Sequence, residues 1–263
     1  MTAPKSFFRL PEWIFPVGAI LLMFWAMADC ALAKDDAPAH LSKQSENLPP
    51  VTECQLLLSD AEAAEQGFVR QRRMYPASSR QRLSEQAVRE GFNAATQKEA
   101  MACFNRAWRF NPENPMAYWG AGIVRGGEAM RYGEKNNLDI ARKCWDDCLK
   151  LFEMGAQLLN HVSSVRKVEF QMDQAQSYIS YADTMKDHLD DHGKALLEKA
   201  EAIVLQYYNC TLFKPEENRR VKTRAAWQLW KIYAALGKNE EAEKYNKEAE
   251  GFRREYLRET DGK

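Results

Sequence analysis

The chain lacks a net charge and the short motifs that mark common catalytic sites. Its 37 Lys and Arg residues balance 37 Asp and Glu residues, so bulk electrostatics favour neither nucleic acid nor an acidic substrate. No Gly-x-Ser-x-Gly motif marks a nucleophilic serine, and no glycine-rich loop follows a strand to hold phosphate. We interpret the one local basic run as a solvated helix end and loop; it comprises Arg70, Arg72, Arg73, Arg80 and Arg82.

The signals of β-structure are missing as well. No segment from about Val51 onward alternates convincingly between apolar and polar residues, and β-branched residues are sparse. The 263 residues are 45% hydrophobic and 28% charged, which suits a soluble protein of one large or two modest domains. The missing strand patterns therefore argue against a β protein and favour an all-α fold.

The N-terminus predicts export. Lys5 and Arg9 precede an apolar stretch from Ile14 to Ala28, and two small-x-small sites follow at 26–28 and 31–33. This order of a positive region, a short apolar region and a cleavage site is that of a secretory signal peptide. We therefore expect residues 1–33 to be a signal peptide, and the mature protein to be periplasmic.

Two alternatives for this segment stay open. Residues 14–33 are about one bilayer span long, so they could form an uncleaved anchor on the outer side of the inner membrane. Asp29 near the end of the span makes cleavage the favoured interpretation. Cys30 suggests a lipoprotein, but Asp29 occupies a position where small residues are usual. The polar stretch 34–50 is expected to be a flexible linker before a helical domain at 51–263.

The cysteines leave the question of disulfides open. An exported chain can form disulfides, but the five cysteines after Cys30 are an odd number: Cys54, Cys103, Cys144, Cys148 and Cys210. Cys144 and Cys148 lie four apart on an expected helix, so their Cα atoms would be about 6 Å apart. A bond between them is geometrically conceivable. The favoured interpretation is two small buried residues between helices.

Apolar stripes at steps of three and four predict helices throughout the domain. Thr96 and Glu99 form a capping box, and Asn114 before Pro115 gives a cap and a first-turn proline. Gly237 ends one helix, and Asn239 begins the next. The short turns imply antiparallel neighbours. The expected helices are 53–73, 79–94, 97–110, 115–131, 138–159, 164–187, 193–208, 216–236 and 240–257.

A repeated pattern of small and aromatic residues appears in two of these helices. Ala100, Phe104, Ala107 and Pro112 resemble the second-helix half of a tetratricopeptide repeat, which has a period of 34 residues. The first helix of the next repeat is matched by Tyr118, Ala121 and Gly122. Small residues let helix backbones approach, and the neighbouring aromatic fills the gap beside them.

Two further matches support this resemblance, which covers about half of the mature chain. They comprise Ala141, Trp145 and Cys148, about seven residues late, and Leu229, Tyr233, Gly237, Ala242 and Ala249. Gly91 departs from the pattern, because an aromatic is expected there, and helices 164–208 show little of it. The resemblance implies an all-α fold of about 8–9 helices, in which antiparallel pairs stack as a right-handed α-solenoid with a concave face.

The resemblance also implies a binding groove lined by the first helix of each pair. Trp108, Trp145 and Trp230 are interpreted as core residues, whereas two other tryptophans fall on the groove face. By position, that face comprises Arg82, Glu85, Arg89, Trp119, Ile123, Arg224, Trp227 and Lys231. Aromatic rings beside Arg or Lys suit an extended peptide or its carboxylate. We expect an exported scaffold that binds a protein or peptide segment, without catalysis or cofactor and without a nucleic-acid partner. Contact with a membrane would come only through an uncleaved N-terminus.

The alternative function is a metal-binding or hydrolytic helical protein. His188 and His192 lie four apart, a spacing at which two histidines on a helix can bind one Zn²⁺. A zinc protease of the His-Glu-x-x-His type needs a Glu after the first His, and Leu189 stands there. Gly193 follows directly and indicates a helix end and turn. We therefore expect no metal site here. A third possibility is a structural part of an envelope complex.

Overall fold

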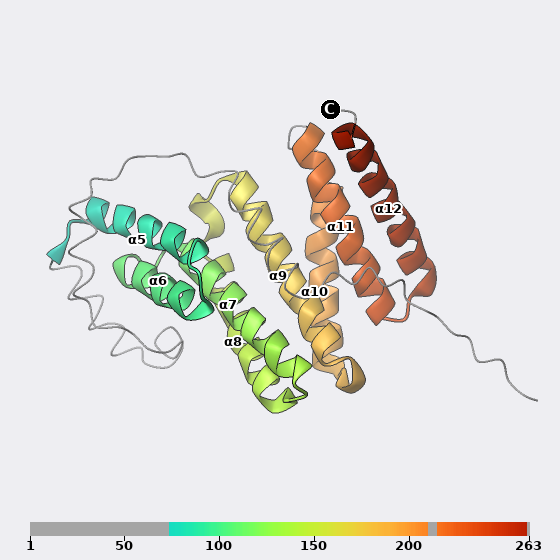
Figure 1. The fold of residues 1–263 in the computed structure, drawn as a ribbon, viewed down its shortest axis with the longest axis horizontal. Helices are drawn as coiled ribbons and strands as arrows, with labels where there is room; N and C mark the ends of the chain where they lie inside the picture. Colours follow the sequence, from blue (N-terminus) through green and yellow to red (C-terminus); the bar gives the residue numbers. More distant parts are fainter. Residues whose placement is uncertain (1–73, 210–214, 262–263) are drawn as a thin grey trace, which may run out of the picture. The chain divides into compact units, whose positions relative to one another are not determined.

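The computed structural model describes residues 74–209 and 215–261, and these residues are helical with no strand among them (Figure 1). The predicted N-terminal segment, the linker, the helix at 53–73 and cysteines 30, 54 and 210 lie outside the described residues. The α-helices are α5 (Ala77–Phe92), α6 (Gln97–Phe110), α7 (Pro115–Glu134), α8 (Leu138–Ala156), α9 (Ser164–Thr184), α10 (Asp191–Tyr208), α11 (Pro215–Ala235) and α12 (Asn239–Asp261). The all-α expectation is confirmed for this part of the chain.

Helix ends follow the local sequence signals. The Thr96 side chain accepts a hydrogen bond from Glu99 N while the Glu99 carboxylate accepts one from Thr96 N, so the predicted capping box at α6 is present. Asn114 caps α7 ahead of Pro115, also as predicted. Gly237 ends α11 with a φ of 72°, a left-handed conformation that suits a residue without a Cβ.

Most predicted helix bounds differ from the structure by one to four residues, and three of the differences have a local cause. The predicted helices 138–159 and 164–187 end at Ala156 and Thr184, and short 3₁₀ turns, Leu159–His161 and Lys186–His188, follow them. The last turns tighten because backbone groups there bond three residues back, as His188 N does to Met185 O at 2.7 Å. Helix α10 begins at Asp191, two residues before the predicted start at 193. Asp190 caps it, because its Oδ1 accepts a hydrogen bond from Gly193 N at 2.9 Å.

Neighbouring helices are antiparallel, and alternate helices are parallel. Each helix packs against the next one in the chain, and the odd-numbered helices α5, α7, α9 and α11 also pack against one another. Contacts of α7 with α9 pair Trp119 with Phe170 and Gly133 with Thr184, so the residue numbers rise together. The odd-numbered helices therefore form one layer, and the even-numbered helices pair with them. This is the stacking of helix pairs found in an α-solenoid.

Glycines allow aromatic rings to enter the helix contacts. A Cβ on Gly120 of α7 would overlap the Phe104 ring of α6, and a Cβ on Gly91 of α5 would lie 2.7 Å from the same ring. Two residues further along α7, and on another side of the helix, a Cβ on Gly122 would lie 3.0 Å from the Phe152 ring of α8. Phe104 thus fills the space between two glycines. This contact explains why position 91 is a glycine, although the repeat pattern expects an aromatic residue there.

The core extends along the layer of helices. Trp145 of α8 is buried, and a Cβ on Gly126 of α7 would lie 3.2 Å from its ring and 3.3 Å from Cys148 Sγ. Cys144 and Cys148 are both buried free thiols, so the interpretation of small packing residues is confirmed. Burial raises the pKa of the Cys148 thiol to about 12. In the described ranges, no helix has the length and apolar character needed to cross a membrane.

Candidate partner-binding face

The candidate groove residues all lie on odd-numbered helices. Arg82, Glu85 and Arg89 are on α5, Trp119 and Ile123 on α7, and the remaining three, Arg224, Trp227 and Lys231, on α11. Helix α9 supplied no candidate, yet it lies between α7 and α11 and packs against both. The side chains of α9 therefore decide which candidates come together.

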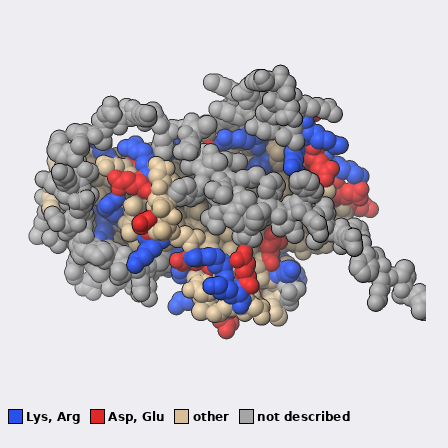
Figure 2. All heavy atoms as spheres, in the orientation of Figure 1, with Lys and Arg blue, Asp and Glu red and all other residues tan. Residues whose placement is uncertain are grey.

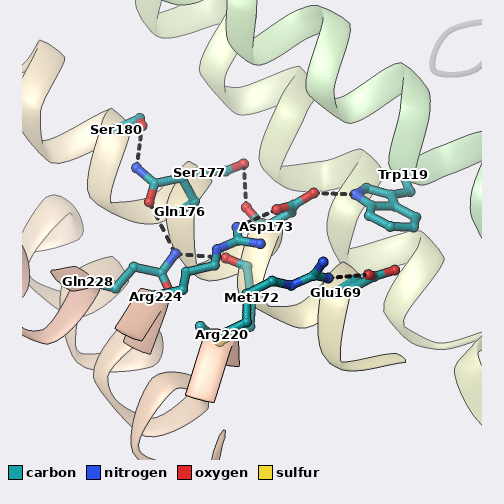
Figure 3. A network of polar contacts seen from close by, with 10 residues as sticks. All are labelled: Trp119, Glu169, Met172, Asp173, Gln176, Ser177, Ser180, Arg220, Arg224 and Gln228. Carbon is teal, nitrogen blue, oxygen red and sulfur yellow. Dashed lines mark hydrogen bonds and ion pairs between the residues drawn. The ribbon is translucent and has the colours of Figure 1, made fainter. Parts of the chain in front are cut away.

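Asp173 of α9 connects two of the candidates. Its Oδ2 accepts a hydrogen bond from Trp119 Nε1 at 2.9 Å, and its Oδ1 pairs with the Arg224 guanidinium (Figure 3). The Asp173 side chain is 6% exposed and that of Arg224 is 25% exposed. A buried carboxylate needs such partners, because its desolvation is otherwise costly. The two candidates are thus in one polar network, which the sequence did not predict.

The Trp119 ring has aromatic contacts with two other helices. The ring meets Phe92 of α5 with centroids 5.6 Å apart and Phe170 of α9 with centroids 5.9 Å apart. Its indole N–H is used by Asp173. Trp119 is therefore half-buried and joins three odd-numbered helices, which makes it a poor choice for a variant meant to test binding alone.

Helices α9 and α11 are joined by a ladder of polar contacts. Arg220 pairs with Glu169 at 3.1 Å, and Gln228 Nε2 donates to Met172 O at 2.9 Å and to Gln176 Oε1 at 3.1 Å (Figure 3). Burial raises the pKa of Glu169, and the Arg220 guanidinium opposes that rise. We refer to the contacts of Glu169, Asp173 and Gln176 with α11 as the α9–α11 seam.

Trp227 is the most exposed tryptophan of the described chain, with 36% of its surface accessible. Its ring meets that of Trp230 edge to face, with centroids 6.4 Å apart. The Lys231 ammonium lies 5.7 Å from the Trp227 centroid and 5.5 Å from the Trp230 centroid, and it pairs with Asp183 at 3.5 Å. These contacts hold an exposed indole ring in place beside a cation that is already paired.

The remaining candidates do not join this network. Arg82 and Glu85 are exposed on α5, where Glu85 accepts from Gln81 at 2.6 Å, and Arg89 is half-buried. Ile123 is half-buried and packs against the main core. Within the described ranges, the α5 candidates make no side-chain hydrogen bond or ion pair with those of α11. Among the described side chains that are visible in Figure 2, basic and acidic groups lie among one another.

The two histidines of the alternative function lie at a turn. His188 is exposed in the 3₁₀ turn before α10, and His192 is exposed in the first turn of α10. The His192 ring meets the Tyr181 ring edge to face at 5.7 Å. The predicted helix end and turn is confirmed at this point. Throughout the described ranges, no group of three or more His, Cys, Asp or Glu side chains is arranged to hold a metal ion.

No protein-family model matches the chain, and a search of curated proteins found no match.

The sequence reasoning missed the acidic and amide residues of α9. A usable signal was present, because Glu169, Asp173 and Gln176 recur at steps of four and three on the same helix. On α11, Arg220, Arg224 and Trp227 follow the same steps. Two helices with polar residues at matching spacing can face each other with those residues in register.

Proposed function

We propose that the chain is an exported, tetratricopeptide-like interaction module that binds a partner segment on the face of α5, α7, α9 and α11. The observation that carries the proposal is the layer of parallel odd-numbered helices, on which all eight candidate residues fall. In stacked helix pairs, one such layer provides an extended binding surface. The proposed activity is binding and not catalysis.

The packing residues support the tetratricopeptide-like assignment. Ala107 of α6 and Ala121 of α7 are fully buried, and Phe104 fills the gap beside Gly120. These are the positions at which the repeat family uses small and aromatic residues to bring two helices together. Close approach of two helix backbones requires small residues at these positions. The matched residues therefore make the helix contact that the repeat pattern implies.

Export is the second part of the proposal, and it rests on the sequence alone. The positive region, apolar stretch and small-x-small sites of residues 1–33 would direct the domain across the inner membrane. In that setting the domain would act in the periplasm, either free or held by its N-terminus. N-terminal sequencing of the purified mature protein distinguishes the two, since a cleaved chain would begin near Asp29 or Lys34.

Site-specific photocrosslinking in the native host tests the binding face. A photoreactive amino acid replaces Trp227, which is exposed on α11, and a matched variant carries it at Ile140, which is 42% exposed on the even-numbered helix α8. We expect a discrete crosslinked partner from position 227 and none from position 140. Lys231→Ala in the first variant should lower the yield, because Lys231 lies one turn from position 227 on the same proposed binding face.

The result that contradicts the proposal is equally specific. Equal crosslinking from positions 227 and 140 would mean that the odd-numbered layer is not the binding face. Loss of crosslinking with Lys231→Ala is interpretable only if the variant folds, which circular dichroism and the denaturation midpoint establish.

A further inference from the structure

Around Glu169, in the first half of the α9–α11 seam, the described side chains hold more positive than negative charge. Three guanidinium groups, those of Arg166, Arg220 and Arg224, act electrostatically on the Glu169 carboxylate, and Asp173 is the second carboxylate beside it. Arg224 is committed to Asp173, and Arg220 to Glu169. Arg166 has no ion pair within the described ranges. Around the Glu169 carboxylate, three described guanidinium groups therefore lie near two described carboxylates.

The excess charge lies where a partner can reach it. The Arg220 side chain is 53% exposed although it is paired, whereas that of Asp173 is 6% exposed. Arg166 is half-buried on α9, one turn before Glu169. A guanidinium has five N–H donors. An exposed one can therefore stay paired with one carboxylate and donate hydrogen bonds to a second.

An apolar group lies farther along the same face of α11. Trp227 follows Arg220 by seven residues, which is two helical turns, so both side chains are on one side of the helix. Seven residues correspond to about 10 Å of helix, which an extended peptide spans with about three residues. Beyond Trp227 the charge is balanced, because Lys231 is paired with Asp183.

We propose that the partner segment is an extended acidic peptide whose side-chain carboxylates bind Arg166 and Arg220 and whose apolar residue contacts the Trp227 ring. This inference rests on the proposed function and adds the chemical class of the partner. The argument is charge complementarity: the accessible excess is positive at one end of the face, and the accessible ring lies about three extended residues away. The acidic side chains of the partner supply the carboxylate that the seam lacks.

Peptide binding to the full-length protein tests whether the partner segment is acidic. The probe is a fluorescein-labelled hexapeptide with three glutamates followed by an alanine, a phenylalanine and an amidated alanine, so that it has no terminal carboxylate. The control peptide has glutamine in place of each glutamate. Fluorescence anisotropy at low salt should show at least roughly tenfold tighter binding of the glutamate peptide, as expected when charge-assisted contacts are lost.

Two matched double variants locate the site. Arg166→Gln with Arg220→Gln should weaken binding of the glutamate peptide roughly tenfold. Arg253→Gln with Arg254→Gln, two exposed residues of α12, removes the same charge and should change affinity less than about twofold. Circular dichroism and denaturation midpoints confirm that both variants fold.

Three other outcomes would contradict the proposal of an acidic partner. Equal binding of the two peptides, absence of binding, or an equal loss in both double variants would exclude an acidic partner at this seam. The proposed function is tested separately: a partner crosslinked from position 227 would survive failure of the glutamate peptide, and only the acidic class would fall. Failure of both experiments would remove both proposals.

Discussion

The contacts α5–α7 and α9–α11 occupy equivalent places in the helix layer but are built from different chemistry. Between α5 and α7, the Phe104 ring enters the space left by Gly91 and Gly120. Between α9 and α11, the contact is a ladder of ion pairs and amide hydrogen bonds centred on Asp173. Both pairs of helices are parallel, so the geometry of the layer does not dictate which chemistry holds it.

This difference indicates which of the two helix contacts tolerates substitution. An aromatic ring between glycines leaves no room for another atom, because protein interiors are packed as densely as organic crystals. A polar seam at the surface can exchange partners, because water or a ligand can replace a hydrogen bond. We therefore expect the first contact to carry stability and the second to combine moderate stability with binding. Four experiments test this comparison.

The largest effect should come from Phe104→Ala. Phe104 is 2% exposed, and its loss would leave a cavity between Gly91 and Gly120. Core Phe to Ala changes cost about 3–5 kcal/mol, which should appear as a lower free energy of unfolding in urea titrations. Ile140→Ala, at a 42% exposed position, should cost less than about 1 kcal/mol. Equal costs would show that the ring is not central to the contact.

Gly120→Ala should destabilise the protein by a smaller amount. The added Cβ would overlap the Phe104 ring, and overpacking typically costs about 1–3 kcal/mol, partly offset by the higher helix propensity of Ala. The matched control is Gly251→Ala on α12, where an added Cβ has nothing within 4 Å. That change should stabilise the chain by about 0.5–1 kcal/mol. A stabilising Gly120→Ala would contradict the tight contact.

Asp173→Asn tests the polar seam with a smaller expected loss. An Asn side chain can still accept from Trp119 Nε1, but it no longer pairs with Arg224 as an anion. We expect a loss of about 1 kcal/mol, because the Arg224 guanidinium reaches solvent and is not left fully buried. A double-mutant cycle with Arg224→Gln isolates the pair. A more stable Asp173→Asn protein would show that desolvation outweighs the attraction.

Cysteine labelling tests whether the tightly packed part of the helix layer opens in the native protein. It needs no substitution, so the stability of the protein is unchanged. Because burial raises the pKa of Cys148 to about 12, its reactive thiolate is scarce at pH 8 and increases with pH. Iodoacetamide labelling followed by mass spectrometry should therefore find Cys148 unmodified in the native protein and modified in denaturant. Rapid native labelling at Cys148 would mean that α7 and α8 separate readily, contrary to the tight packing around Gly126.

Much of the fold could be predicted from the sequence, because its signals are local. The helix at 97–110 was predicted with its exact bounds, since Thr96 and Glu99 form the capping box that starts it. The ends of α8 and α9 were predicted too late, because apolar residues continue the helical pattern into 3₁₀ turns. A stripe of apolar residues indicates which face is buried, but it does not distinguish the last α-helical turn from a tighter one.

The candidate site was less accessible to sequence reasoning. Trp119 was assigned to the groove by its position in a repeat, yet its indole N–H is used by Asp173, which lies 54 residues away. Such a contact depends on the register between two helices, which no local pattern reports. Helix α9 also matches the repeat pattern poorly, so the resemblance assigns no role to its acidic residues. By contrast, Trp227 is exposed, and its place on a binding face stays a prediction.

The stacking of neighbouring helices has a consequence for how the chain folds. Gln228 and Met172 are 56 residues apart, the longest sequence separation among the hydrogen bonds described above. Each helix pair can therefore find its contacts before the distant parts of the chain have been ordered, and short separations favour rapid folding. Helix α12 packs mainly against α11, whereas α8 packs against both α7 and α9, so amide hydrogen exchange is expected to be faster in α12 than in α8.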